Sequence, residues 1–369
     1  MDERVITAML PYFQVAFFNP SSPYAPAVAV RRAYEAAKES IARQIGGKAD
    51  ELVMTAGATE SVNLAIHQAA GHVIVAATEH HSVLRAAQTK DHTILDVDEH
   101  GRVSLDHLRR AIRPDTELIS IALANNEIGT IQPLRDIAAM IKEIRIERRA
   151  QGNSTRLLLH SDASQGVGQL DIHVARLGVD LLTLNAAKMY GPKQVGLLWA
   201  SSQVVLRPLL AGGGQEHGVR SGTENVAGVI GFERALTLVS DRRESEVQRL
   251  ETLKEAMRKE LTAAFPDAVL SGHPKHQLAG HLHISFAHLD AERVLFALES
   301  RGVLVATGSA CAANKGTRSH VLEAIGMSPE VADGSLRITF GHLSSSENTA
   351  LASRAIIEEV KREYERMHR

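Results

Sequence analysis

Three polar residues, Asp162, Gln165 and Lys188, come shortly after two apolar runs of the sequence. Asp162 and Gln165 follow residues 157–161, and Lys188 follows residues 179–184. If both runs are neighbouring buried strands, they bring these side chains to one edge of a sheet, where open α/β sheets bind ligands. A lysine there can form a Schiff base, and a nearby carboxylate can keep a pyridine nitrogen protonated. The three residues therefore predict pyridoxal phosphate (PLP) chemistry.

Taken singly, each of these residues has a commoner structural explanation. A lysine usually lies on the surface, and an aspartate that follows a strand often caps the next helix. Two strand ends with complementary chemistry, together with the groups described next, favour the functional interpretation instead.

Residues 57–61 read Gly-Ala-Thr-Glu-Ser and follow another apolar run at residues 53–55. A glycine, a hydroxyl and unsatisfied backbone N–H groups at a helix start form a phosphate cradle. Ala58 and Thr59 are therefore candidate phosphate ligands. The alternative, in which Thr59 is an ordinary helix cap, is equally compatible with this motif alone.

Three further groups support a PLP site when they are considered together with these residues. His80 follows the apolar residues 73–76 and can lie over a flat ring, although a lone histidine there is more often structural. The loop 212–223 begins with three glycines and carries donors that suit an anion. Cys311 lies among small residues at 307–316, and a cysteine in a polar loop is more often reactive than a buried one.

The composition limits the class of protein. The chain has 369 residues, of which 44% are hydrophobic, and its 41 basic and 43 acidic side chains nearly balance. This length exceeds one ordinary core, so two domains are expected, and the charge favours neither nucleic acid nor membrane as a partner. The charged start and the lack of a long apolar stretch argue against a signal peptide and a membrane span. One cysteine excludes an internal disulfide and a cysteine metal cluster, so we expect a soluble cytoplasmic protein.

Strand and helix patterns alternate through the first part of the chain. Helical spacing from Val28 to Ile45 ends at two glycines, and buried runs then alternate with helices as far as Arg149. This alternation predicts a mainly parallel sheet covered on both faces. From about Ser240 a long charged helix over 241–264 opens a smaller α+β region, in which a second helix is expected near 291–299. We therefore predict a large PLP-binding domain at 1–240 and a small C-terminal domain at 241–369 that carries the cysteine loop.

Seven motifs, in order along the chain, resemble those of cysteine desulfurases of the NifS/IscS type. These are fold-type I PLP enzymes of the class V aminotransferase group, and the resemblance runs from about Leu10 to Gly341. It implies an α/β fold with a mainly parallel seven-stranded sheet flanked by helices and a smaller α+β C-terminal domain. The motifs are Gly57-Ala58-Thr59-Glu60-Ser61, Thr78-Glu79-His80, Asn125-Asn126-Glu127-Ile128-Gly129, Asp162-Ala163-Ser164-Gln165, Lys188-Met189-Tyr190-Gly191-Pro192-Lys193, Arg220-Ser221-Gly222-Thr223 and Gly308-Ser309-Ala310-Cys311.

The resemblance implies roles around the cofactor. Lys188 would hold PLP and move protons at the substrate α-carbon, and Asp162 would pair with the pyridinium nitrogen. Gln165 would hydrogen-bond the ring oxygen, and His80 would stack on the ring and assist proton transfer. The phosphate would be bound by Thr59 and, across a homodimer, by Thr223 of the partner subunit.

The resemblance also implies roles toward the substrate, L-cysteine. Asn126 and Arg337 would hold its carboxylate, a task suited to a bidentate guanidinium. Cys311 would attack the sulfur, retain it as a persulfide and leave L-alanine. The long segment after Cys311 resembles the branch with an extended catalytic loop. No intrinsic metal is expected, and the only metal contact implied is transient ligation of an iron–sulfur cluster by Cys311.

The sequence departs from the family pattern at three places. The family usually has Ser-Gly-His before its lysine, whereas Asn185-Ala186-Ala187 stands here. Asn185 can replace the serine as a phosphate ligand, but Ala187 has no donor. The family's opening strand, Asp-Asn-Ala-Ala-Thr-Thr-Pro, has no counterpart, which suggests a native start upstream of Met1. The chain also stops at Arg369, without the tail that scaffold-type members use to dock the iron–sulfur assembly protein.

Two other functions stay open. A selenocysteine lyase or another β-eliminating PLP enzyme would use the same fold, although Cys311 disfavours a pure aminotransferase. A degenerate, non-catalytic partner protein is suggested by Ala187 and the missing strand. The intact residues Lys188, Asp162, His80 and Cys311 argue against it. The sulfur acceptor is left open between an iron–sulfur scaffold, a tRNA-thiolating protein and a DNA-modifying partner.

Overall fold

The chain divides by spatial proximity into two compact units in the computed structural model, which describes residues 1–308 and 318–367. The first unit comprises three stretches: Met1–Leu95, Leu105–Leu123 and Pro133–Arg243. The second unit also comprises three stretches: Asp96–Ser104, Ala124–Gln132 and Glu244–Arg369. The division predicted from the sequence differs at the two short early stretches, because a single boundary cannot represent a chain that leaves a unit and returns to it.

A seven-stranded sheet in the order β1-β7-β6-β5-β4-β2-β3 forms the centre of the first unit. The strands are β1 (Leu52–Thr55), β2 (His72–Ala76), β3 (His92–Leu95), β4 (Thr116–Ser120), β5 (Leu158–Asp162), β6 (Leu181–Asn185) and β7 (Gly196–Ala200). β7 runs antiparallel to its neighbours β6 and β1, and the other neighbouring pairs run parallel. The predicted mainly parallel sheet is confirmed, and β1 to β6 all end at the same edge.

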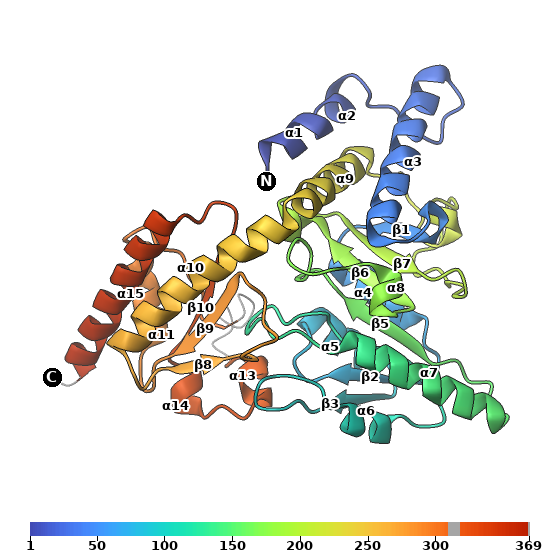
Figure 1. The fold of residues 1–369 in the computed structure, drawn as a ribbon. Coiled ribbons are helices and arrows are strands. Elements are labelled where there is room, and N and C mark those ends of the chain that lie inside the picture. Colours follow the sequence, from blue (N-terminus) through green and yellow to red (C-terminus); the bar gives the residue numbers. More distant parts are fainter. Residues whose placement is uncertain (309–317, 368–369) are drawn as a thin grey trace. The chain divides into compact units, whose positions relative to one another are not determined.

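The strands are apolar along most of their length because both faces of the sheet are covered (Figure 1). Every residue of β2 and of β7 is buried, so neither strand shows a polar-apolar alternation. Val62 and Ile66 of α4 (Ala58–His67) and Val83 of α5 (His81–Ala87) pack in one apolar cluster with strand residues such as Val75 and Leu198. Burial on this scale, at about 25 cal/mol per Å² of apolar surface, dominates the stability of the unit.

Helices and short 3-10 turns make up the rest of the first unit. They are α1 (Glu3–Met9), α2 (Pro11–Gln14), α3 (Ala25–Ile45), η1 (Ala49–Glu51), α6 (Leu105–Ala111), α7 (Leu134–Ala150), α8 (Val174–Leu177), η2 (Ala186–Met189), η3 (Glu216–Gly218) and α9 (Val226–Asp241). The predicted amphipathic helix ending at Ile45 is α3, whose stripe Val30, Tyr34, Ala37 and Ile41 is buried. Gly46, at φ +74°, ends it in the left-handed conformation that glycine adopts readily.

A three-stranded antiparallel sheet in the order β10-β9-β8 forms the centre of the second unit. Its elements are α10 (Arg243–Ala264), β8 (Val269–Ser271), β9 (His281–Ser285), α11 (Ala291–Glu299), α13 (His320–Ala324), α14 (Pro329–Ala332), β10 (Ser335–Thr339) and α15 (Ser346–Met367). The predicted long charged helix is α10, and the helix predicted at 291–299 has those bounds. Throughout residues 1–308 and 318–367, helices long enough to cross a bilayer are too polar to do so.

Candidate active site

Asp162 and Lys188 come from adjacent strand ends of the first unit. Asp162 is the last residue of β5 and pairs in register with Thr183 of the parallel strand β6. β6 ends at Asn185 and continues into η2, which carries Lys188. The two apolar runs are thus neighbouring parallel strands, as predicted, and their polar residues reach the same edge of the sheet.

Gly196, the first residue of β7, brings a third polar segment to this edge. It pairs with Asn185 of β6 on one side and Thr55 of β1 on the other. A Cβ atom at Gly196 would lie 2.7 Å from Cα of Gly57 and 2.9 Å from the carbonyl oxygen of Leu184. The absence of a side chain therefore lets the backbone at Gly57 approach the end of β6.

The start of α4 offers unsatisfied donors beside that approach. Gly57 is the N-cap of α4 with φ +134°, and no side chain caps the first-turn amides. A Cβ atom built on Gly57 would meet nothing within 4 Å, so the space beside it is open. Thr59 is exposed and Ala58 half-buried at this point. Free amides, the helix dipole and a hydroxyl in open space fit a phosphate dianion.

Glu60 lies in the same helical turn, where its charge would repel an anion if it were isolated. Its Oε1 accepts a hydrogen bond from Nε of Arg220 at 2.8 Å, and its Oε2 accepts one from the amide of Ala56 at 2.6 Å. The ion pair offsets the negative charge and ties the glycine-rich loop to α4.

Glu216 anchors the glycine-rich loop at a second point. Its buried carboxylate accepts hydrogen bonds from Nζ of Lys38 at 3.0 Å, from the amide of Met54 at 2.8 Å and from the hydroxyl of Tyr34. Burial and the Glu216 charge raise the pKa of the Tyr34 hydroxyl well above its usual range. Thr223, farther along the same loop, is exposed. The sequence suggested an anion-binding loop but no role for Glu216, whose partners lie far away in the chain.

His80 is oriented by the helix that it begins. It is exposed at the N-cap of α5, and its Nδ1 accepts a hydrogen bond from the amide of Ser82 at 3.1 Å. Because Nδ1 is an acceptor, the neutral ring carries its proton on Nε2. The ring is thus held through its Nδ1 side at the start of α5.

Asp162 is fixed by its own turn, since its Oδ1 accepts a hydrogen bond from the amide of Ser164 at 2.9 Å. Two residues earlier on β5, His160 lies between Oγ of Ser120 at 2.8 Å and Oγ1 of Thr183 at 2.9 Å. Burial lowers the pKa of His160 to about 3, so the ring is neutral. This polar row joins β4, β5 and β6 directly behind Asp162. Gln165, three residues after Asp162, is half-buried.

Asn126 and Arg337 belong to the second unit and contact each other. An Nη of Arg337 donates to the backbone oxygen of Asn126 at 3.4 Å, although 211 residues separate them. Burial lowers the pKa of the Arg337 guanidinium, and the Glu127 carboxylate opposes that shift. Cys311 lies outside the described residues. Among residues 1–308 and 318–367, no cluster of His, Asp or Glu side chains could hold a metal ion.

Comparison with known proteins places the chain in a family. A model of the aminotransferase class-V family matches residues 1–351. The chain belongs to the aminotransferase class-V family. This chain is 40% identical over 358 residues to a cysteine desulfurase IscS of Dictyoglomus turgidum. The match covers 94% of this chain and 88% of the relative.

Solved structures agree with this assignment. A NifS-like protein matches with a TM-score of 0.88 and 29% identity, covering 97% of this chain and 95% of that one. A structure of SspA in complex with cysteine matches with a TM-score of 0.77 and 31% identity, covering 92% and 95% of the two chains. The predicted family and fold class are confirmed.

Glu79 is a further candidate site residue, for which the sequence predicts no role. It follows β2 directly, is 2% exposed, and accepts a hydrogen bond at Oε1 from the amide of Ala122 at 2.7 Å. Burial raises the pKa of the Glu79 carboxyl to about 8, and the Asp162 charge acts in the same direction. Glu79 is therefore protonated at neutral pH.

We expect Glu79→Gln to flatten the pH dependence of stability. A carboxyl with a raised pKa keeps a proton that the unfolded chain has lost, so the folded state loses stability as pH rises toward about 8. The buried histidines with lowered pKa values change the free energy of unfolding only below about pH 6.5. Between about pH 6.5 and 8 the parent should therefore lose about 1.4 kcal/mol per pH unit relative to the variant.

Urea unfolding at several pH values measures this slope. Glu35→Gln, which alters an exposed glutamate of α3, should keep the slope of the parent. Equal slopes for the parent and Glu79→Gln would show that Glu79 is ionised in the folded protein.

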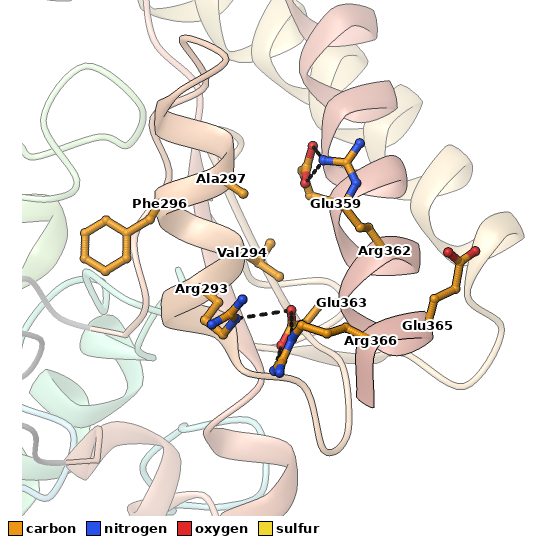
Figure 2. Close-up of a pocket in the computed structure, with 9 residues that line it drawn as sticks. All are labelled: Arg293, Val294, Phe296, Ala297, Glu359, Arg362, Glu363, Glu365 and Arg366. Atoms are coloured by element: carbon orange, nitrogen blue, oxygen red, sulfur yellow. Dashed lines mark hydrogen bonds and ion pairs between the residues drawn. The ribbon is translucent and has the colours of Figure 1, made fainter. Parts of the chain in front are cut away.

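A cavity of about 600 Å³ lies in the second unit, and none of the residues that line it is predicted for the site (Figure 2). It is bordered by α11 and α15, and its charged walls pair internally, as in Arg293–Glu363 and Arg362–Glu359. The Phe296 ring lies on the side of α11 away from α15. Because these charges are paired with each other, they give no reason to assign a ligand to the cavity.

Proposed function

We propose that the chain is an L-cysteine desulfurase that uses PLP to remove sulfur from L-cysteine. The observation that carries the proposal is a lysine and a carboxylate at adjacent strand ends, beside an uncapped helix start with open space for a phosphate. The relative from Dictyoglomus turgidum is named a cysteine desulfurase, and SspA was solved with cysteine. Both names support the choice of substrate.

PLP, when bound, draws electrons away from the substrate α-carbon. Lys188 would hold it covalently and would then carry protons to and from that carbon. Asp162, with its orientation set by Ser164, would keep the pyridine nitrogen protonated. Gln165 would donate to the ring oxygen, and His80 would stack on the ring and assist proton transfer. The neutral, hydrogen-bonded His160 keeps the strand that carries Asp162 in register.

The phosphate would be held by charge-assisted hydrogen bonds from the start of α4, namely from the amides at Ala58 and Thr59 and the Thr59 hydroxyl. Thr223 of the partner subunit adds a hydroxyl. Asn185 uses its Oδ1 to accept a hydrogen bond from the amide of Ala187 at 3.2 Å. The donors of its side-chain NH₂ group are not used in that bond, and they would serve as the remaining phosphate ligand.

Asn126 and Arg337 hold the substrate carboxylate, and Cys311 takes the sulfur. The Cys311 thiolate attacks the substrate sulfur and forms an S–S bond. The carbon–sulfur bond breaks, its electron pair stays on the β-carbon, and that carbon takes a proton. L-Alanine leaves and Cys311 keeps a persulfide for an acceptor protein.

Exposed apolar side chains in residues 13–18 support the homodimer that places Thr223 beside a second cofactor. Phe13 is 56% exposed, and Val15 and Phe17 are each 78% exposed. Large apolar side chains concentrated in one short segment mark an interaction surface more often than a free one. A cytoplasmic location and an acceptor from iron–sulfur cluster or tRNA-thiolation pathways are further parts of the proposal.

Incubating the purified protein with L-cysteine, PLP and a thiol reductant tests the function. We expect an absorbance band near about 420 nm, together with equal amounts of alanine and sulfide. Sulfide accompanied by pyruvate and ammonia would instead indicate β-elimination, and strong preference for selenocysteine would indicate a lyase. If neither the absorbance band nor turnover is observed, the result favours the non-catalytic partner protein.

Ala187→His should slow the loss of PLP. Each charge-assisted hydrogen bond to a phosphate is worth roughly 1.5–3 kcal/mol, and Ala187 supplies none from its side chain. Ala187 is exposed at this edge, so the side of η2 has room for a ring. PLP released during dialysis, followed by absorbance, measures the effect, with Ala187→Leu as the control for bulk. Equal retention in the parent and both folded variants would mean that the phosphate is already fully bonded.

A further inference from the structure

His283 lies beside Arg337 in the small sheet of the second unit. The two residues are direct partners in the antiparallel pair β9–β10, and Ser271 of β8 is the partner of His283 on its other side. Direct partners in such a pair have Cβ atoms about 4.5–5.5 Å apart and point to the same face. Ser271, His283 and Arg337 therefore form one row across the three strands.

The row lies on the polar face of this sheet. Leu282, Ile284, Leu336 and Ile338 alternate with it and enter the apolar core formed with α10, α11 and α15. The polar face is covered as well, by the stretch 124–132 of the same unit. A Cβ atom at Gly129 would lie 2.8 Å from Cβ of His281, and Thr130 bridges to Gln277. Water is thus excluded from a face that the sequence made polar.

Several buried polar atoms in this row have no hydrogen-bond partner among the described residues. They are Nδ1 and Nε2 of His283, Nε of Arg337 and Oγ of Ser271. His283 is 0% exposed and Ser271 is 7% exposed. Such atoms are few in native proteins and each costs stability, so four of them in one row indicate a function rather than a structural need.

The charge state of His283 complements its neighbour. Burial, followed by the positive charge of Arg337, lowers the pKa of His283 to about 4. The neutral imidazole has one acceptor nitrogen and one N–H donor. The acceptor suits an N–H of the Arg337 guanidinium, and the donor suits an oxygen of a carboxylate that Arg337 binds. A second cation at this position would repel the guanidinium, whereas neutral imidazole does not.

We propose that His283 is a positioning residue that orients the Arg337 guanidinium and thereby selects amino-acid substrates with an α-carboxylate. The backbone of Arg337 is already held on its other side, where its amide and carbonyl bond with those of Ala306 at 2.7 and 3.1 Å. The remaining freedom is in the side chain, whose other fixed contact is the Asn126 oxygen at 3.4 Å. The inference rests on the proposed role of Arg337 as the carboxylate ligand.

His283→Leu in the PLP-loaded enzyme tests this role. We expect KM for L-cysteine to rise roughly 10- to 100-fold, the usual worth of a hydrogen bond to a charged group. Hydroxylamine, an amine without a carboxylate, should discharge the cofactor band at the parent rate. The melting temperature should stay level or rise, because leucine removes two unpaired buried atoms. His283→Asn, which keeps a donor and an acceptor, should restore most of the affinity.

His281→Leu is the matched control, because His281 lies on the same strand and face but pairs with Thr339. It should change stability without raising KM for L-cysteine. An unchanged KM in His283→Leu, or an equal loss toward L-cysteine and hydroxylamine, overturns the inference while the parent turns over cysteine. A parent without cysteine turnover overturns the proposed function instead, so the two failures are distinct.

Discussion

Lys188→Ala is expected to abolish the absorbance band of bound PLP and to lower cysteine turnover by at least roughly 10³-fold. The lysine is the covalent attachment point and the proton carrier, and alanine can do neither. In the parent, borohydride should reduce the linkage, and mass spectrometry of the digested protein should place the reduced cofactor on Lys188.

Lys193→Ala is the matched control, because it removes an exposed lysine five positions farther along the same segment. It should keep the band and the turnover. Reduced cofactor on Lys193 would show that the attachment site is misassigned, even if the protein is a PLP enzyme.

Cys311→Ser is expected to keep the PLP spectrum and the binding of L-cysteine, yet to form no persulfide and almost no alanine. A serine hydroxyl is not ionised near neutral pH, so it cannot attack sulfur as a thiolate does. Because the other residues proposed to hold PLP and the carboxylate are unchanged, binding should persist while transfer is lost.

Radiolabelled sulfur from L-cysteine, followed on non-reducing gels, measures the persulfide directly. Because Cys311 is the only cysteine, label on the parent protein has one thiol to occupy. Ser309→Ala, two positions away, controls for disturbance of the segment. Alanine production by Cys311→Ser at the parent rate would remove Cys311 from the mechanism and favour simple elimination.

The elements that could be predicted are those with strong local patterns. α11 was predicted near its observed bounds, and the strands that end at Asp162 and Asn185 were predicted from the mostly apolar runs 157–161 and 179–184. In such segments burial of the side chains and backbone propensity favour the same conformation. The common edge then followed from the rule that parallel strands end together.

The residues that escaped prediction depend on contacts between distant segments. The local sequence indicates only that Glu216 lies in a loop, because its bonding partners Tyr34 and Lys38 are 182 and 178 positions away. His283 stands in a strand whose polar residues alternate with apolar ones, a pattern that ordinarily indicates a solvent-facing side. Its burial depends on residues 124–132, which are distant in the sequence, so no local pattern predicts that His283 is buried.

The stretch Ala124–Gln132 also affects how the protein is made. Ile128 is fully buried against Val321 and Leu322, which leave the ribosome much later. At about 5–20 residues per second, a nascent chain waits roughly tens of seconds between making Ile128 and making its partners. The large sheet can form in that interval because its last strand ends at Ala200. Until Leu322 is made, Ile128 lacks these apolar partners, so the partly made chain is a natural client for chaperones during that interval.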